Sequence, residues 1–293
     1  MAEGERRTAA VLALMLNAFV WGVAWWPFRG LQAHGVHPLW ATVVVYLTSF
    51  TVFLVLRPAG LRGFARQPLL WVLAAAAGMT NIGFNWAVTI GDVVRVVLLF
   101  YLMPAWSVLL AWLVLGERPT GAALGRLLLA LAGVMFVLDA GTGGLPLPRT
   151  LPDFLALLGG FSFALTNVML RKLRHEPPAS RVLAMFGGGA ALAAAVALVG
   201  MTQGSVAPIP PPTLAWLPLV ALLSGGFLAA NLALQFGAAR LPAHTTALVM
   251  LSEVVFASLS SVALGAAELT GRTLAGGLLI LAAAAWSAWP RRG

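Results

Sequence analysis

Ionisable and amide side chains inside long apolar stretches are the residues of this chain that could do chemistry. Glu253 is the one acidic residue deep in such a stretch, and Met250 lies on the same helical face. A carboxylate at that depth is costly, so Glu253 is a candidate proton site or counter-charge for a substrate ammonium. The alternative is a protonated or hydrogen-bonded glutamate that fixes helix packing. The sequence leaves both roles open.

Amide side chains form a second set of candidates. Asn81 and Asn85 are four residues apart and share a helix face, as do Asn231 and Gln235. Amides supply neutral donors and acceptors, which suit the carboxylate and ammonium of a zwitterion without the desolvation penalty of a fixed charge. The alternative is hydrogen bonding between helices, worth about 0.6 kcal/mol in membranes. Asn81, Asn85, Asn167 and Asn231 are therefore candidate substrate-binding residues.

Aromatic side chains also lie deep in the apolar stretches. Trp21 shares a stripe with Asn17 and Trp25, and Tyr46 and Tyr101 lie in two further stretches. Such rings could line a pocket for an apolar or aromatic substrate. The alternative is anchoring at the membrane interface, where Trp and Tyr are enriched. We include Trp21, Tyr46 and Tyr101 among the candidates for substrate binding.

Catalytic machinery finds little support in the sequence. The chain has no cysteine, and no cluster of His, Asp or Glu offers a metal site. A Walker-type loop for ATP is also lacking. Gly160-Phe161-Ser162 lacks the second glycine of a nucleophile elbow. We therefore expect no enzyme activity, no metal and no cofactor.

The composition identifies the solvent in which these residues must be positioned. Of the 293 residues, 60% are hydrophobic and only 9% are charged, and the mean hydropathy is +0.93. A soluble domain with a water-facing surface does not have such a balance, so the chain is expected to fold in a lipid bilayer. The net charge of +9 does not indicate nucleic acid, because the basic residues are not gathered on one solvated face.

Ten apolar stretches are long enough to be transmembrane helices. With the N-terminus inside, 14 of the 18 Lys and Arg residues fall on the cytoplasmic side, and only Arg29, Arg95, Arg149 and Arg272 fall outside. The positive-inside rule then places both termini in the cytoplasm. The stretches are residues 9–31, 38–56, 68–90, 94–115, 121–139, 151–170, 182–201, 213–236, 243–264 and 272–289.

The ten stretches divide into two sets of five, which predicts one repeat at residues 1–146 and a second at residues 147–293. An odd number of crossings per repeat forces the two copies into opposite orientations. Inverted repeats of this kind are the architecture of secondary transporters, whose halves close alternately around a midplane site. Polar residues recur in both sets in the same order, in the pairs Arg29 and Arg171, Asn85 and Asn231, and Glu117 and Glu268.

The end of the fourth stretch resembles the drug/metabolite transporter superfamily, and specifically its ten-helix EamA-type members. Members of that family close this span with a Leu-Gly-Glu motif, have a proline within the span and have a Trp-Gly pair in the first span. Two positions of the second repeat depart from the family pattern, namely Ala266-Ala267-Glu268 and Glu253-Val254, where Leu-Gly-Glu and Glu-Pro are expected. The matching residues are Leu115-Gly116-Glu117, Pro119, Thr120, Gly125, Pro104 and Trp21-Gly22.

The resemblance implies an all-α integral membrane protein with ten transmembrane helices in two inverted five-helix repeats. The aromatic-rich first half looks most like the YddG-type exporters of aromatic and other neutral amino acids. That likeness implies a transporter of the bacterial inner membrane that acts on small neutral metabolites. We expect the substrate and the lipid bilayer as partners and no nucleic acid, and the sequence is compatible with a monomer. A drug or organic-cation effluxer of the same fold is the alternative, with Glu253 as its binding charge. A channel and an intramembrane enzyme are alternatives from other classes.

Overall fold

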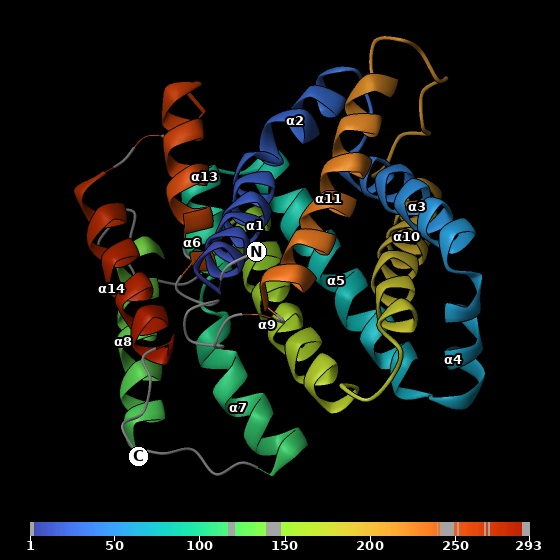
Figure 1. Cartoon of the computed structure of the whole chain (residues 1–293). Helices are drawn as coiled ribbons and strands as arrows, with labels where there is room; N and C mark the ends of the chain where they lie inside the picture. The colour runs from blue at the N-terminus through green and yellow to red at the C-terminus, as the bar shows by residue number, and fades with distance from the viewer. Residues whose placement is uncertain are drawn as a thin grey trace.

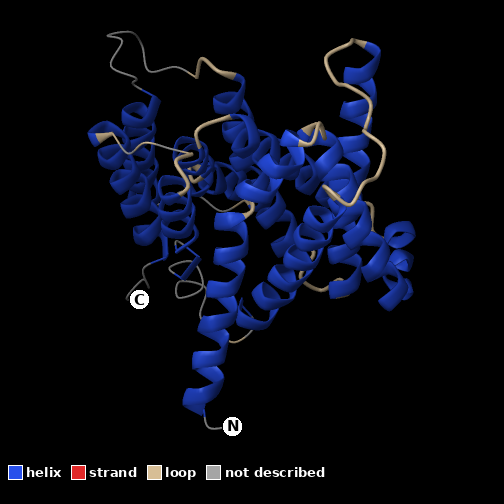
Figure 2. Cartoon of the chain, turned by 90° about the horizontal axis from the view of Figure 1, so that it is seen from above, coloured by secondary structure: helices blue, strands red, loops and turns tan. Residues whose placement is uncertain are grey.

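The structure is a computed structural model, and it describes residues 3–116, 121–138, 148–238, 240, 249–250, 252–266, 268 and 270–288. Every regular element in this part of the chain is helical, and none of its residues forms a strand (Figure 2). Residues 139–147, which join the two predicted repeats, lie outside the described residues, and so do Glu117, Pro119 and Thr120 of the family motif. The predicted all-helical character is confirmed.

The helices follow the predicted stretches in order. Seven helical segments are long and apolar enough to cross a membrane, and shorter apolar helices at Leu127–Phe136, Ser252–Ala263 and Gly271–Ala283 account for the remaining stretches. The fold class, a multi-span membrane protein, is therefore confirmed. The helices are α1 (Glu3–Val23), α2 (Trp25–Ala33), α3 (Pro38–Leu56), η1 (Pro58–Leu61), α4 (Arg62–Arg66), α5 (Leu69–Ile90), α6 (Val93–Phe100), α7 (Met103–Leu115), α8 (Gly121–Leu138), α9 (Leu151–Lys172), α10 (Pro178–Thr202), α11 (Leu217–Ala238), α13 (Ser252–Ala263) and α14 (Gly271–Ala288).

Two of the stretches that the sequence presents as continuous are each divided into two helices. The first is interrupted at Ala24 and the fourth at Tyr101 and Leu102. A proline stands three residues beyond the start of each interruption, at Pro27 and Pro104. Because proline has no backbone N–H, it cannot donate to the carbonyl four residues earlier, and the helix is broken there.

The two halves pack against each other in a matching pattern. The third span of the first half, α5, packs between α9 and α10 of the second half. The third span of the second half, α11, packs in turn against α1 and α3 of the first half. The fifth spans, α8 and α14, pack together at one edge of the bundle, opposite the edge formed by α3, α4 and α10 (Figure 1). The contacts of the two third spans thus correspond, with the roles of the halves exchanged.

Glycines allow several of these helices to approach closely. A Cβ at Gly83 of α5 would lie 2.6 Å from the Leu155 carbonyl oxygen of α9, and one at Gly133 of α8 would lie 2.7 Å from the Gly276 carbonyl oxygen of α14. Gly188 of α10 lies directly against the backbone of Ala74 of α5. Small residues at such crossings permit the backbone packing by which membrane helices associate.

The predicted orientation gives a direct labelling test. The α10–α11 loop should lie outside, and we call this end of the bundle its outer end. Ser205 is an exposed residue of that loop, so a Ser205→Cys variant should react with a membrane-impermeant maleimide added to intact cells. Ala65→Cys, at an exposed position of α4, should react only after the membrane is opened. The opposite pattern would overturn the topology, and the cysteine-free chain gives no background.

Candidate functional site

Six aromatic rings form a continuous row between the two halves of the bundle. Trp21 of α1 is stacked on Phe227 of α11, with ring centroids 4.4 Å apart. Every other neighbouring pair is tilted or edge-to-face, with centroids 4.8 to 6.3 Å apart. These are the arrangements that ring quadrupoles favour. We call this set the central aromatic row, and its order is Tyr46, Phe227, Trp21, Phe84, Phe100 and Tyr101.

One end of the row connects to Glu253. The hydroxyl of Tyr101, in the break between α6 and α7, lies 3.0 Å from the Glu253 Oε2 and 3.2 Å from the Met250 carbonyl oxygen. Tyr101 and Glu253 are 2% and 7% exposed. Gly22 of α1 allows the close approach of α13 here, because a Cβ at Gly22 would lie 2.9 Å from the Glu253 carbonyl oxygen. Three predicted site residues are therefore brought together: Tyr101, Met250 and Glu253.

The Tyr101 hydroxyl can satisfy Glu253 in either protonation state. When Glu253 is ionised, Tyr101 donates its proton to the carboxylate. When Glu253 is protonated, its O–H can donate to the Tyr101 oxygen, and Tyr101 can then donate to the Met250 carbonyl. Neither arrangement leaves a buried donor unpaired, so the geometry is compatible with a carboxyl group that gains and loses a proton.

The other end of the row connects to the predicted amides of α5. The Tyr46 hydroxyl donates to the Asn81 Oδ1 at 2.9 Å, and the Asn85 Nδ2 donates to the Thr42 Oγ1 at 3.3 Å. Gly189 of α10 lies against this cluster, since a Cβ there would be 2.9 Å from the Asn81 Nδ2. The Asn85 Oδ1 is buried and has no hydrogen-bond partner among the described residues. An unpaired buried acceptor favours an incoming donor such as an ammonium or a water.

Two further predicted site residues lie on other helices. Asn231 is a half-buried residue of α11, and Asn167 is an exposed residue of α9. Asn17, an amide of the first span, donates from its Nδ2 to the Ala230 carbonyl oxygen at 2.8 Å. That bond joins α1 to α11, so Asn17 has the helix-linking role that was the alternative for each of these amides.

Sequence reasoning missed the phenylalanines of the row. Phe84, Phe100 and Phe227 have no polar group, and the chain contains 15 phenylalanines. A signal was nevertheless present in their spacing. Phe84 follows Asn81 by three residues, Phe100 precedes Tyr101, and each therefore lies near the helix face or turn that the polar candidates occupy.

At the outer end, Arg29 joins the first and third spans. The Arg29 Nε donates to the Val88 carbonyl oxygen at 3.2 Å, and its Nη2 donates to the Gly91 carbonyl oxygen. Both carbonyls belong to the last turn of α5 and the link to α6. The Arg29 guanidinium also lies 5.1 Å from the centroid of the Trp25 ring. These contacts hold α2 against the outer end of α5.

A bidentate ion pair joins α6 to α9 next to Arg29. The Arg95 Nε lies 2.7 Å from the Asp153 Oδ1, and the Arg95 Nη2 lies 3.1 Å from the Asp153 Oδ2. Asp92 caps α6 by accepting the Arg95 backbone N–H at 2.7 Å. Burial raises the pKa of Asp92, while the Arg95 N–H and the Arg29 charge oppose that shift. We call Arg29, Asp92, Arg95 and Asp153 the outer clasp, because together they join four helices at this end.

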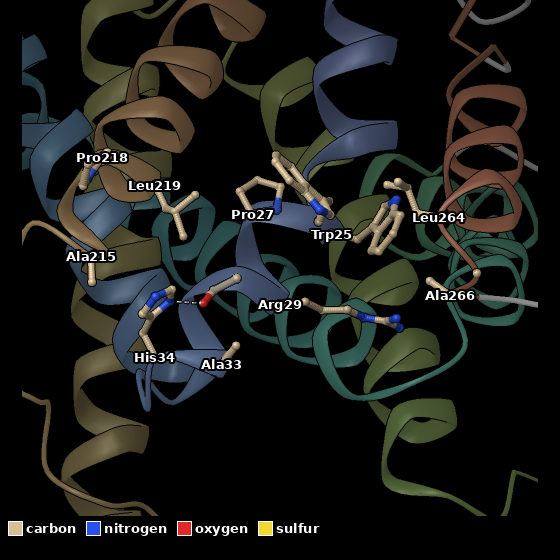
Figure 3. Close-up of a pocket in the computed structure, with 13 residues that line it drawn as sticks. Trp25, Pro27, Arg29, Ala33, His34, Ala215, Pro218, Leu219, Leu264 and Ala266 are labelled. Atoms are coloured by element: carbon tan, nitrogen blue, oxygen red, sulfur yellow. Dashed lines mark hydrogen bonds between the residues drawn. The ribbon is translucent and has the colours of Figure 1, made fainter.

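A pocket of about 700 Å³ lies beside the clasp, between α2, the start of α11 and the end of α13. Figure 3 shows Arg29 directed towards Ala266 on one side of the pocket. His34 lies on the other side, where its Nδ1 is hydrogen-bonded to the Gly30 carbonyl oxygen. The remaining lining of the pocket is mainly apolar, with Trp25 and Leu219 among the described residues. The predicted substrate-binding residues are not among those lining residues, so this outer pocket is separate from the central aromatic row.

No cofactor or metal role is evident in the described residues. They contain no group of three or more His, Asp or Glu residues arranged to hold a metal ion. Among the described residues, the carboxylates of the outer clasp are paired with arginines. The chemistry available at the row is therefore binding by aromatic and amide groups, together with one carboxyl group that can exchange a proton.

Comparison with known proteins gives two findings. The sequence model of the EamA-like transporter family matches residues 8–139 and again residues 150–289. A solved structure titled only "Crystal structure of protein" is 23% identical, covers 94% of each chain and superposes with a TM-score of 0.60. At that identity the likeness concerns the fold alone. Among curated proteins, none matches this chain significantly.

Proposed function

This chain belongs to the EamA-like transporter family, and from that premise we propose that it is a secondary transporter that exports small neutral metabolites. Its proposed substrates are aromatic and other neutral amino acids, as for the YddG-type exporters. The proposed location is the bacterial inner membrane, with cytoplasmic termini, a monomeric chain and two inverted repeats at 1–146 and 147–293. Alternating access of the central aromatic row to the two sides would move the substrate.

The central aromatic row is the observation that supports this substrate class. Its six rings offer face and edge contacts to an apolar or aromatic side chain. Polar groups stand at both ends, with Asn81 and Asn85 beyond Tyr46 and with Glu253 beyond Tyr101. A zwitterion needs a donor for its carboxylate and an acceptor for its ammonium, and amides provide both without a fixed charge. The proposed binding residues remain Trp21, Tyr46, Asn81, Asn85, Tyr101, Asn167, Asn231, Met250 and Glu253.

The outer clasp is a physical barrier to the release of substrate at the outer end of the bundle. Arg29 and the Arg95–Asp153 pair join the outer ends of α2, α5, α6 and α9. Release of a substrate to the outside between these helices requires at least some of those bonds to break. We therefore assign the described conformation to a state in which this part of the outer end is closed.

A drug or organic-cation effluxer is the second candidate, and one specific observation favours it. Glu253 is a buried carboxyl group next to the Tyr101 ring. A cation at this position could pair with the carboxylate and also with an aromatic face, which attracts cations. Its substrates would be lipophilic cations, whereas the first proposal predicts zwitterions.

Counterflow in proteoliposomes distinguishes these proposals. Proteoliposomes that contain the purified protein would be loaded with an unlabelled substrate. Entry of the labelled substrate would then be measured for phenylalanine, tryptophan, alanine, threonine and tetraphenylphosphonium. Saturable counterflow of the amino acids supports the first proposal, and counterflow of the cation alone supports the second. Flux that does not saturate would indicate a channel. Chemical conversion of a substrate without its movement would indicate an enzyme.

Glu253→Gln tests the role of the carboxyl group. For a neutral amino acid we expect transport to stay nearly unchanged, because a zwitterion brings its own compensating charges. The glutamine can still accept the Tyr101 hydrogen bond, so the expected cost is about 0.5–1.5 kcal/mol of stability. Transport would be measured in proteoliposomes with and without a pH gradient, next to Glu268→Gln, which changes an exposed glutamate. Loss of transport in a monodisperse, thermally stable Glu253→Gln protein would instead assign Glu253 a proton or cation site.

A further inference from the structure

The segment that joins α3 to α5 is built as a fixed surface element. Residues 57–68, which we call the inner linker, contain η1 and α4. The Ser180 Oγ donates to the Gly60 carbonyl oxygen at 2.8 Å, and a Cβ at Gly60 would lie 3.1 Å from the Ala179 carbonyl oxygen. Gly63 lies against Ser180, where a Cβ would be 2.6 Å from the Ser180 Oγ. These contacts dock the inner linker on the start of α10.

The inner linker displays positive charge, and the described carboxylate that contacts it is Glu176, which accepts a hydrogen bond from the Gln67 Nε2 at 3.4 Å. Arg57, Arg62 and Arg66 are exposed, and residues 57–68 contain no acidic side chain. Within the part of the chain that the structure describes, these three side chains make no ion pair or hydrogen bond. Arg62 and Arg66 are four residues apart, so they share one face of α4. Next to the linker, the Nε of Arg181 is buried and has no described hydrogen-bond partner.

The apolar side chains of this region place the charges at a membrane surface. Leu61 is 44% exposed and Trp71 is 61% exposed. Phe64 packs edge-to-face on Trp71, with ring centroids 5.0 Å apart. The linker also directly joins two membrane-length helices, because it follows α3 and precedes α5. An exposed tryptophan beside arginines at the end of a span is typical of the level at which lipid headgroups meet acyl chains.

From this arrangement we infer that the inner linker is a binding site for the headgroup of an anionic phospholipid. In this site Arg57, Arg62 and Arg66 would pair with the headgroup phosphate, and Leu61 and Trp71 would contact the upper part of the acyl chains. Arginine donates to phosphate in a bidentate manner, which favours it for this role. A bound lipid would link α3, α5 and α10 at their inner ends. This inference does not depend on which substrate the protein transports.

Quenching of Trp71 by brominated lipid tests the inference. The protein would be reconstituted in phosphatidylcholine that contains a small fixed fraction of either brominated phosphatidylglycerol or brominated phosphatidylcholine, with bromine near the headgroup end of the chains. The quenching that disappears in Trp71→Phe is the contribution of this site. We expect phosphatidylglycerol to quench Trp71 more strongly than phosphatidylcholine does. Its apparent affinity should be higher by about fivefold for each arginine that binds the headgroup. Arg62→Gln together with Arg66→Gln should lower the preference for phosphatidylglycerol by about 25-fold and leave only the contribution of Arg57.

A charge-matched control separates a local site from net charge. Arg149→Gln together with Arg272→Gln removes the same charge from the predicted outer side and should leave the preference intact. Equal quenching by both lipids in the unmodified protein, or an unchanged preference in the linker variant, would overturn the inference. Displacement of brominated phosphatidylglycerol by micromolar pyrophosphate at constant ionic strength would assign the site to a soluble polyanion instead. If the double variant is not monodisperse, Arg62→Gln alone provides the test, with half the loss expected on a logarithmic scale.

Discussion

Trp21→Ala is expected to reduce transport of phenylalanine and tryptophan roughly tenfold, and transport of alanine and threonine by less than about twofold. Trp21 occupies the middle of the central aromatic row, stacked on Phe227 and edge-to-face with Phe84. Only a large substrate uses the contact area that the indole offers. One aromatic pair is worth about 0.5–1.5 kcal/mol beyond its buried area, which is enough for such a difference in rate. Counterflow rates in proteoliposomes measure it.

The control for this variant must lose a similar amount of packing elsewhere. Trp216 is 4% exposed at the start of α11, donates to the Pro211 carbonyl oxygen at 3.2 Å and is not part of the row. Trp216→Ala should therefore lower thermal stability without changing the preference between large and small substrates. Tyr101→Ala should act like Trp21→Ala, because it removes the ring at the end of the row. Equal losses for all four amino acids in both row variants would mean that these rings are structural.

Gly188→Ala is expected to cause a large loss of stability. Its Cβ would lie inside van der Waals distance of the Ala74 carbonyl oxygen, and backbone atoms cannot rotate away as a side chain can. The helices α5 and α10 would have to separate, and α10 also packs against α3. We expect a loss of about 3 kcal/mol, at the upper end for overpacked cores, and a Tm lower by about 6 °C or more.

Gly225→Ala is the matched control, because it adds the same atom to another glycine in the middle of a membrane-length helix. Nothing lies within 4 Å of the position that its Cβ would take. Alanine favours a helix over glycine by up to about 1 kcal/mol, so this variant should be neutral or slightly stabilised. Thermal unfolding of the purified proteins in one detergent compares them. Equal Tm values would show that α5 and α10 do not pack as closely as described.

The membrane fold could be predicted from the sequence because each span is determined by the residues of its own segment. Hydropathy over about 20 residues identifies a span without any knowledge of its neighbours. The ten stretches, their order and the all-helical class follow from that property. The interruptions at Ala24 and Tyr101 were also local, since Pro27 and Pro104 remove the backbone donors. Both stretches were nevertheless expected as continuous spans, so the two breaks and the position of Tyr101 next to Glu253 required the structure.

The candidate site was predictable only in part, because its members meet across the two halves. Glu253 and Tyr101 were identified from their depth in apolar stretches, but 152 residues separate them, and no local pattern pairs them. The same holds for Phe227, which the sequence did not distinguish from other phenylalanines. In a soluble helix the apolar face indicates which side is buried. In a bilayer the outer face is apolar too, so the rotation of each helix is decided by its partners.

What the sequence by itself determined, then, was which segments enter the membrane and which polar residues they must accommodate, because the transfer of each segment into lipid depends on its own composition. What only the tertiary structure decided was which side chains meet there: the six rings of the central aromatic row, the Tyr101–Glu253 hydrogen bond and the outer clasp. Those contacts depend on backbone approach at positions such as Gly22, where a single added methyl group would hold two helices apart.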